Sequence, residues 1–338
     1  MKTKSRGVTL VELMVAIAIM GIISTGIATM FTNIQRNYSV EDARLGINTA
    51  NQTAINKISV NLTSTKRLFQ NTAGDNAFLA LANLASPTPA AMTGSVLPVI
   101  NDGASLTPSS GTFVTSAVGN SLFFASLDLP FTTVPTILDA TASTHTVRVD
   151  SYHFNYYYLT QNTSPSVGGS PQIMLWEWHS TSVADYSQIT SGWDSTLQSN
   201  LVKSLVTAGY KYAWDPSQNT AASAFYSLNA SGAVTALGTA PTLTQSSAAA
   251  MIKPITGTLG VGYRYGVAPN TSAAFNIPYT VPQFGTASGL FPSGFEIVVV
   301  GSSSAREVLL RLVLTAQGAF KGYIANQKIT VATARDVH

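Results

Sequence analysis

The sequence predicts an α+β protein in which one long N-terminal helix packs on an antiparallel β-sheet. Three observations support this prediction. First, a short basic stretch is followed by a long apolar run. Second, apolar side chains in residues 32–70 recur at helical spacing. Third, apolar and polar residues alternate in the C-terminal third, as they do in β-strands. Because the helical signals come first and the strand signals follow, the pattern favours α+β over an alternating α/β architecture.

The apolar run extends from Val8 to Phe31 and contains one charged residue, Glu12. As a helix this run would be about 36 Å long, enough to cross a hydrocarbon core of about 30 Å. Three basic residues precede it, so the positive-inside rule places the N-terminus on the cytoplasmic side. An ordinary secretory signal peptide is the alternative, but the apolar core of such peptides is shorter, about 7–15 residues.

Glu12 is the most informative residue of the run. A carboxylate inside an apolar membrane helix costs on the order of 2.5–3.5 kcal/mol, so an acid at this place indicates a function. The stretch Gly-Val-Thr-Leu-Val-Glu-Leu, residues 7–13, resembles the processing site of type IV prepilins and type II secretion pseudopilins. The resemblance implies that a prepilin peptidase cleaves after Gly7 and N-methylates Val8. It also implies that Glu12 neutralises the α-amine of a neighbouring subunit during assembly.

Two positions depart from the usual pattern of that family. The first mature residue is typically phenylalanine, whereas this chain has Val8. Gly21 matches a mid-segment glycine, but Thr29 stands where members of the family often have a proline. Gly21 and Gly26 are therefore the candidate points of helix flexibility, because glycine lowers helix stability.

The chain divides into a leader peptide (1–7), a transmembrane and assembly helix (8–31), an amphipathic continuation (32–70) and a β-rich globular head (71–338). We expect one continuous helix to about Phe69. Ser39 and Asp42 resemble a capping box, so a break at 37–39 is an alternative. The predicted apolar stripe consists of Ile34, Tyr38, Leu45, Ile55, Ile58, Leu62 and Phe69.

The head shows its clearest strand signals in two hairpins. One joins 146–159 to 172–179, and the other joins 294–301 to 306–316 through a loop at 301–305. Residues 191–213 are predicted to be weakly helical or irregular, and 215–250 to be loop. Residues 71–142 are expected to be mostly loop with a few short strands. The other expected strands are 97–100, 112–118, 121–127, 260–267 and 328–335.

Composition narrows the classes of function. The chain has 338 residues, no cysteine and 10% charged residues, against about 25% in an average protein. Its net charge of +3 comes from the leader, since removal of residues 1–7 leaves 15 basic and 15 acidic residues. Nucleic-acid binding is therefore not expected.

Catalytic and metal-binding patterns are missing from the sequence. The four histidines lack metal-ligand spacing, although His153 and His179 lie in presumed strands and could face each other. There is no phosphate-binding loop and no Gly-x-Ser-x-Gly elbow. We expect no enzyme activity, no cofactor and no metal.

Aromatic residues gather in the first predicted hairpin. Strand alternation places Tyr152, Phe154, Tyr156 and Tyr158 on one face, and cross-strand packing in the core accounts for them. The alternative is a stacking surface for a glycan or a partner protein, and its candidate residues are Tyr156, Trp176 and Trp178.

The resemblance implies a minor pilin or pseudopilin-like subunit, because the chain is long for a main repeating subunit. Its implied partners are other pilin subunits, the prepilin peptidase, the inner-membrane assembly machinery and the lipid bilayer. Its implied location is the inner membrane, single-pass, and then a periplasmic or extracellular filament. A surface adhesin mounted on a pilin-type helix is one alternative, and a membrane-anchored enzyme is another.

Overall fold

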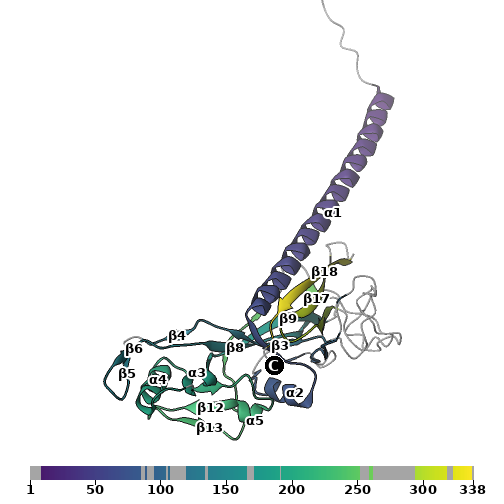
Figure 1. Ribbon diagram of the computed structural model, residues 1–338. Coiled ribbons are helices and arrows are strands. Elements are labelled where there is room, and N and C mark those ends of the chain that lie inside the picture. Colours follow the sequence, from purple (N-terminus) through teal and green to yellow (C-terminus); the bar gives the residue numbers. More distant parts are fainter. Residues whose placement is uncertain are drawn as a thin grey trace, which may run out of the picture.

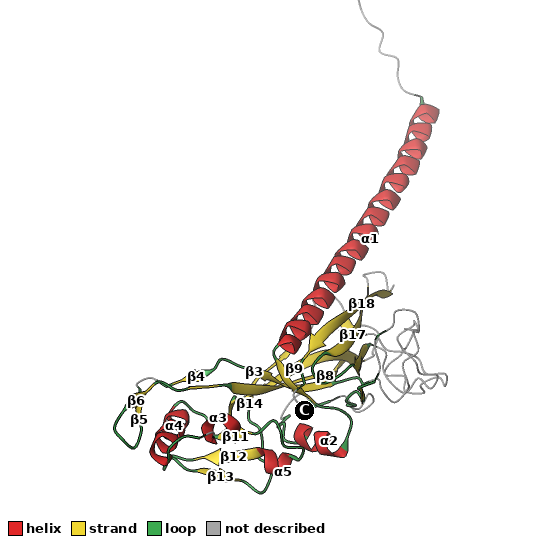
Figure 2. Cartoon of the chain, in the orientation of Figure 1, coloured by secondary structure: helices red, strands yellow, loops and turns green. Residues whose placement is uncertain are grey.

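A computed structural model describes residues 9–84, 88–89, 95–103, 106, 119–133, 136–165, 171–190, 192–251, 259–261, 294–317 and 323–336. A single long helix, α1 (Leu10–Thr63), projects from a β-rich head (Figures 1 and 2). Its 54 residues correspond to about 80 Å. The predicted α+β class is confirmed.

Helix α1 is continuous, but it ends earlier than the sequence suggested. We expected it to reach about Phe69, whereas it stops at Thr63 and the chain enters strand β1 (Thr65–Leu68). The reason is tertiary, since β1 pairs antiparallel with strand β3 (Leu122–Leu127) and the backbone groups of residues 65–68 bond to that strand instead of to a helix. The break considered at 37–39 is absent, since α1 runs through these residues, and the Ser39 hydroxyl donates to the Arg36 carbonyl instead of capping a new helix start.

The apolar stripe of α1 also differs in part from its prediction. Ile55, Ile58 and Leu62 are buried against the head as expected. Tyr38 and Leu45 instead point away from it and are 74% and 65% exposed. The residues that face the head lie three or four apart, which is the spacing of one helix face. Those that are buried are Ile47, Asn51, Ala54, Ile55, Ile58 and Leu62.

Within the described residues, the larger sheet has nine strands and divides into two branches at one side of strand β8. Strand β8 pairs with β3 on one side, and on the other side it pairs with β9 along most of its length and with β10 at its start. One branch continues to β14 and the other runs through β11 and β12 to β13. The bounds are β8 (Ser151–Pro165), β9 (Pro171–Ser180), β10 (Val183–Asp185), β11 (Tyr212–Trp214), β12 (Phe225–Leu228), β13 (Val234–Ala236) and β14 (Gln245–Ala250).

A second sheet lies beside α1 and has five strands in the described part of the chain. Strand β17 is central and pairs with β15, β16 and β18. Two strand pairs are parallel, β10 with β11 and β2 with β16, so the sheets are mixed and not purely antiparallel as predicted. The bounds are β2 (Ile100–Asn101), β15 (Leu259–Val261), β16 (Phe295–Val300), β17 (Arg306–Gln317) and β18 (Tyr323–Ala334).

The remaining elements are short. Helix α2 packs beside α5, and α4 packs on β5 and β12. Strand β4 pairs with β7, and β5 pairs with β6. Their bounds are α2 (Ala73–Leu79), α3 (Tyr186–Thr190), α4 (Ser195–Thr207), α5 (Ala221–Ala224), β4 (Phe131–Thr132), β5 (Ile137–Leu138), β6 (Thr144–His145) and β7 (Arg148–Val149).

The described residues form four buried apolar clusters, of which the smallest contains Val298, Val300 and Leu309. The first joins the C-terminal part of α1 to one face of each sheet, and Ile58, Tyr157 and Leu310 are among its members. The second lies on the opposite face of the larger sheet and contains Phe154 and Trp214. The third lies at the end of the head away from α1 and contains Ile137 of β5, Leu201 of α4 and Leu228 of β12 (Figure 1).

Most predicted strands are present with shifted ends. Both hairpins are confirmed by the antiparallel pairing of β8 with β9 and of β16 with β17. The predicted loop at 215–250 is wrong, since it contains β12, β13 and β14 and the short helix α5. The predicted strand at 112–118, and most of that at 260–267, lie outside the described residues.

Candidate functional site: the N-terminal helix and its attachment to the head

One helix in the described part of the chain is long and apolar enough to cross a membrane. It is α1, whose most apolar window of 18 residues has a mean hydropathy of 2.2 and is wholly exposed. A helix that packed inside its own domain would bury this face, and α1 does so only from Ile47 onward. The apolar half is therefore free of the head and available to lipid.

The first turn of this helix holds Glu12 in a capping box. Thr9 is the N-cap, with an extended backbone. Its amide donates to Glu12 Oε2 at 2.8 Å and its hydroxyl donates to the same oxygen at 3.1 Å, while the Glu12 amide donates to Thr9 Oγ1 at 3.3 Å. Glu12 and Thr9 thus each accept one backbone N–H group that a helix N-terminus otherwise leaves unpaired. No hydrogen bond to Glu12 Oε1 is present within the described residues, so that oxygen can accept a donor from another chain.

The other predicted N-terminal positions have different outcomes. Gly7 and Val8 lie outside the described residues. Gly21 and Gly26 lie inside the unbroken helix, and an added Cβ at either position would meet nothing within 4 Å. Thr25 donates its hydroxyl to the Gly21 carbonyl at 2.8 Å, and Thr29 donates to Thr25 at 2.6 Å. Such bonds slightly weaken and bend helices, so flexibility in this segment stays a prediction.

A polar clamp, which we define as Lys57, Asn61, Tyr157, Glu177 and His179, fastens the C-terminal part of α1 to the head. Glu177, on β9, forms an ion pair with Lys57 of α1. The Tyr157 hydroxyl donates to Glu177 Oε1 at 2.8 Å and accepts from the Asn61 amide at 2.6 Å. His179 Nε2 lies 2.9 Å from the same carboxylate oxygen. A buried carboxylate with this many donors fixes the helix at one register on the sheet.

The clamp makes Glu177 a source of pH-dependent stability. Burial alone would raise the pKa of Glu177, but hydrogen bonds from His179, Lys57 and Tyr157 outweigh it and lower the pKa to about 2. A carboxylate whose pKa is lowered in the folded state stabilises the fold above its unfolded pKa. That contribution is lost as the pH falls through the folded value.

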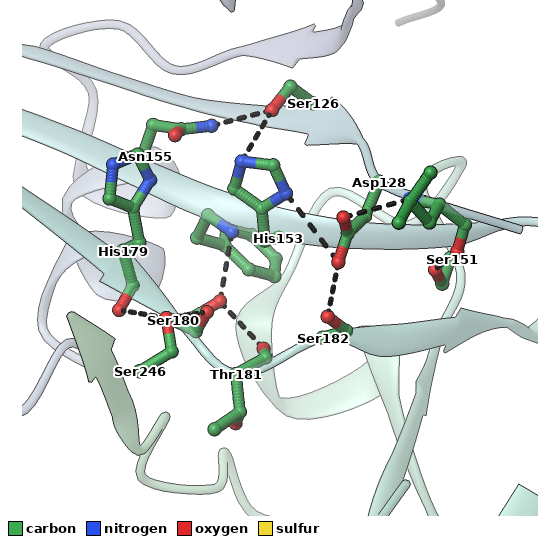
Figure 3. A network of polar contacts seen from close by, with 12 residues as sticks. Ser126, Asp128, Ser151, His153, Asn155, His179, Ser180, Thr181, Ser182 and Ser246 are labelled. Carbon is green, nitrogen blue, oxygen red and sulfur yellow. Dashed lines mark hydrogen bonds and ion pairs between the residues drawn. The ribbon is translucent and has the colours of Figure 1, made fainter. Parts of the chain in front are cut away.

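A second polar group continues from the clamp across β8 and β3 (Figure 3). His153 and His179 face each other with ring centroids 5.5 Å apart, as the sequence allowed. Ser126 Oγ lies 3.2 Å from His153 Nε2, and Asp128 Oδ2 lies 3.9 Å from His153 Nδ1. No group of three or more metal-ligating side chains is present in the part of the chain that the structure describes.

The order serine, histidine and aspartate invites comparison with a hydrolytic triad, which the geometry does not support. Ser126 is 1% exposed and accepts a hydrogen bond from the Asn155 amide at 2.6 Å, so its oxygen is neither accessible nor activated. The separation of 3.9 Å between His153 and Asp128 is longer than a hydrogen bond. These residues connect strands, and they are not placed for acyl transfer.

The aromatic binding surface suggested by the sequence is contradicted by burial. Tyr156 and Trp178 are 0% exposed, and Trp176 is partly buried against the same cluster. They pack with Phe123 and Phe154 beneath α2 and its neighbours, which is the core role that strand alternation favoured. An adhesin function would need another surface.

Residues 2–28 match the prokaryotic N-terminal methylation motif. No curated protein and no solved structure shows significant similarity to the chain. The chain has a pilin-like α+β architecture, in which a long N-terminal apolar helix contacts a large mixed sheet. The matched segment carries the N-terminal methylation motif of the type IV pilin and pseudopilin family.

Two features of this site were not predicted from the sequence, and only one of them has a local signature. The clamp was not predicted, because Lys57 and Glu177 are 120 positions apart and only the fold brings them together. The capping box at Thr9 and Glu12 does have a local signature, Thr-x-x-Glu, which marks a helix start. The interpretation of Glu12 as an intramembrane acid did not include this capping role.

Proposed function

We propose that the chain is a minor pilin or pseudopilin-like subunit that is processed after Gly7 and assembled through α1. Removing seven of 338 residues leaves 331, which favours a minor subunit over a shorter main repeating subunit. Its N-terminus is cytoplasmic before processing, and its head lies in the periplasm or on a filament. The partners that follow are a prepilin peptidase, the inner-membrane assembly machinery and other subunits.

The observation that carries the proposal is the exposed apolar half of α1. This half begins at the capping box of Glu12, and the head packs only on the other half of the helix, from Ile47 onward. Lipid can cover that exposed half before assembly, and neighbouring helices can cover it afterwards. In a filament, Glu12 Oε1 would accept the methylated α-amine of another subunit. Two opposite charges in a low-dielectric setting are strongly preferred over one alone.

A substitution at Gly7 tests this proposal in cells. We expect Gly7→Leu to block cleavage, because the peptidase of the family that this segment resembles cuts after a glycine. The protein should then stay in the membrane fraction at its precursor length and be missing from filaments sheared off the surface. Immunoblotting of both fractions checks this, and Gly103→Ala is the matched control because its added Cβ meets nothing.

The proposal would be contradicted if Gly7→Leu entered the sheared filaments at the level of the unaltered protein. Release of either protein into the medium without its apolar segment would contradict it as well, because a secretory signal peptide behaves in that way.

A further inference from the structure

A small open cavity lies where the connection between β9 and β10 meets the C-terminal end of helix α4. Its volume is about 200 Å³, and it is lined by Thr181, Ser182, Ala208, Gly209 and Tyr210. Thr181, Ala208 and Gly209 are exposed, so solvent reaches the cavity. None of the five residues belongs to the clamp or to α1. The cavity is therefore separate from the parts of the chain on which the proposed function depends.

The topology of the larger sheet places this cavity. Strands β10 and β11 are parallel, and their pairing begins at Ala184 and Ala213. Three residues earlier on each strand, the same register gives Thr181 and Tyr210, which both line the cavity. The cavity thus lies just before the point at which the two strands begin to pair. Because the chain enters β11 from α4, the end of that helix forms one wall.

The wall at the end of α4 is held in place by its own backbone. The amides of Gly209 and Tyr210 donate to the carbonyls of Val206 and Leu205, each at 3.0 Å. Gly209 has a φ of +98°, in the left-handed region that glycine adopts without strain. These bonds satisfy two of the carbonyl groups that a helix end otherwise leaves unpaired. The wall is therefore formed before any ligand arrives, as in most small-molecule sites.

Tyr210 gives the cavity an aromatic side. Its ring meets the ring of Phe131 edge-on, with centroids 5.8 Å apart and an interplanar angle of 70°. Phe131, on β4, is itself packed against the third apolar cluster, so this contact holds the Tyr210 ring in one orientation. Tyr210 is only partly buried. The rest of its ring is available to the apolar face of a ligand.

The connection between β9 and β10 gives the cavity two hydroxyl groups. Ser182 donates its hydroxyl hydrogen to Asp128 Oδ2, which leaves the Ser182 oxygen able to accept a hydrogen bond (Figure 3). The Thr181 hydroxyl has no hydrogen-bond partner in the part of the chain that the structure describes, so it can both donate and accept. No charged side chain lines the cavity.

We propose that this cavity binds one neutral sugar residue. A sugar ring has hydroxyl groups around its edge and C–H groups on its faces, which match the hydroxyls of Thr181 and Ser182 and the ring of Tyr210. The uncharged lining favours a neutral ligand, because an ion would lose water without gaining a counter-charge. The volume is below the roughly 300–1,000 Å³ of sites for larger ligands, so it suits a single residue. The site does not depend on the pilin assignment, since the head alone forms it.

Saturation-transfer NMR of the full chain, in micelles of a detergent without a sugar headgroup, tests the site. The probes are the methyl glycosides of glucose, galactose and N-acetylglucosamine. We expect at least one of them to bind saturably with a dissociation constant on the order of 1–10 mM, because a ligand with few atoms gains little in an open site. The transferred saturation should be strongest at the C–H groups of one face of the sugar ring, which would lie on Tyr210.

Ala208→Phe is expected to weaken binding at least about tenfold, because the larger side chain fills the cavity from an exposed position. Ala222→Phe is the matched control. It makes the same change at an exposed position of α5 outside the cavity, and it should bind as the unaltered chain does. Thr181→Val keeps the shape of the side chain but removes its hydroxyl, and it should weaken binding several-fold.

The proposal would be overturned if none of the three glycosides bound saturably up to about 50 mM. Equal affinity of Ala208→Phe and the unaltered chain would overturn it too, because binding would then occur elsewhere. Saturable binding of Nα-acetyl-lysine methylamide in place of the sugars would assign the cavity to a peptide side chain and contradict a sugar site. None of these results depends on processing at Gly7, so the proposed function is tested separately.

Discussion

Replacing Arg67 by methionine is expected to lower the free energy of unfolding by about 3–5 kcal/mol, because it leaves a buried carboxylate without its cation. Arg67 is 1% exposed, and its Nη2 lies 3.0 Å from Asp75 Oδ1. Its Nη1 donates to the Gln218 carbonyl at 2.6 Å, and its guanidinium lies over the ring of Phe69 at 4.9 Å. The side chain therefore joins β1 to α2 and to the loop after β11.

Urea-induced unfolding of the full chain in micelles checks this value, and the buried Trp178 and Trp214 provide the fluorescence signal. Arg44→Ala is the matched control. Arg44 pairs with Glu41 at 2.9 Å, but both side chains are about 60% exposed, so the expected loss is below about 1 kcal/mol. A loss for Arg67→Met as small as that of the control would contradict a buried anchoring role.

Glu12→Ala is expected to reduce filament incorporation at least about 30-fold, since removing one partner of a buried charge pair costs about 2–5 kcal/mol. Cleavage after Gly7 should continue, because the leader site is unchanged. Quantitative immunoblotting of the membrane and sheared-filament fractions measures both effects. Normal filaments from this variant would remove the role that we propose for the carboxylate.

Glu12→Gln separates the charge of this residue from its capping role. Glutamine at the same position can still accept from Thr9, as in other capping boxes, so the helix start should be retained. It cannot neutralise an α-amine. If charge pairing drives assembly, the glutamine variant should assemble as poorly as the alanine variant, whereas recovery to wild-type levels would show that capping alone is needed.

Local sequence pattern was sufficient for the parts of the fold that depend on local physics. The length of the apolar run predicted the membrane half of α1, and two-residue alternation predicted both hairpins. The burial of Tyr152, Phe154, Tyr156 and Tyr158 on one face follows from the same alternation. These features require no knowledge of distant residues.

The errors arose where distant residues decide the structure. Residues 65–68 continue the helical spacing, but they pair with β3 as a strand. Tyr38 has the spacing of a core residue, but it is exposed because α1 is buried against the head only from Ile47 onward. Strand β14 is a run of Gln, Ser and Ala that has no strand signal, and β9 provides its pairing. The clamp contacts that attach α1 to the head join residues 96 and 120 positions apart, which no local window contains.

We propose that this chain is a prepilin-type subunit whose mature form begins with the apolar helix. Mass spectrometry of the N-terminal peptide, from protein recovered from membranes or filaments, tests it most directly. We expect the first residue to be Val8, with one methyl group on its α-amine and with Glu12 still present. A different first residue, or loss of the whole apolar segment, would contradict the claim.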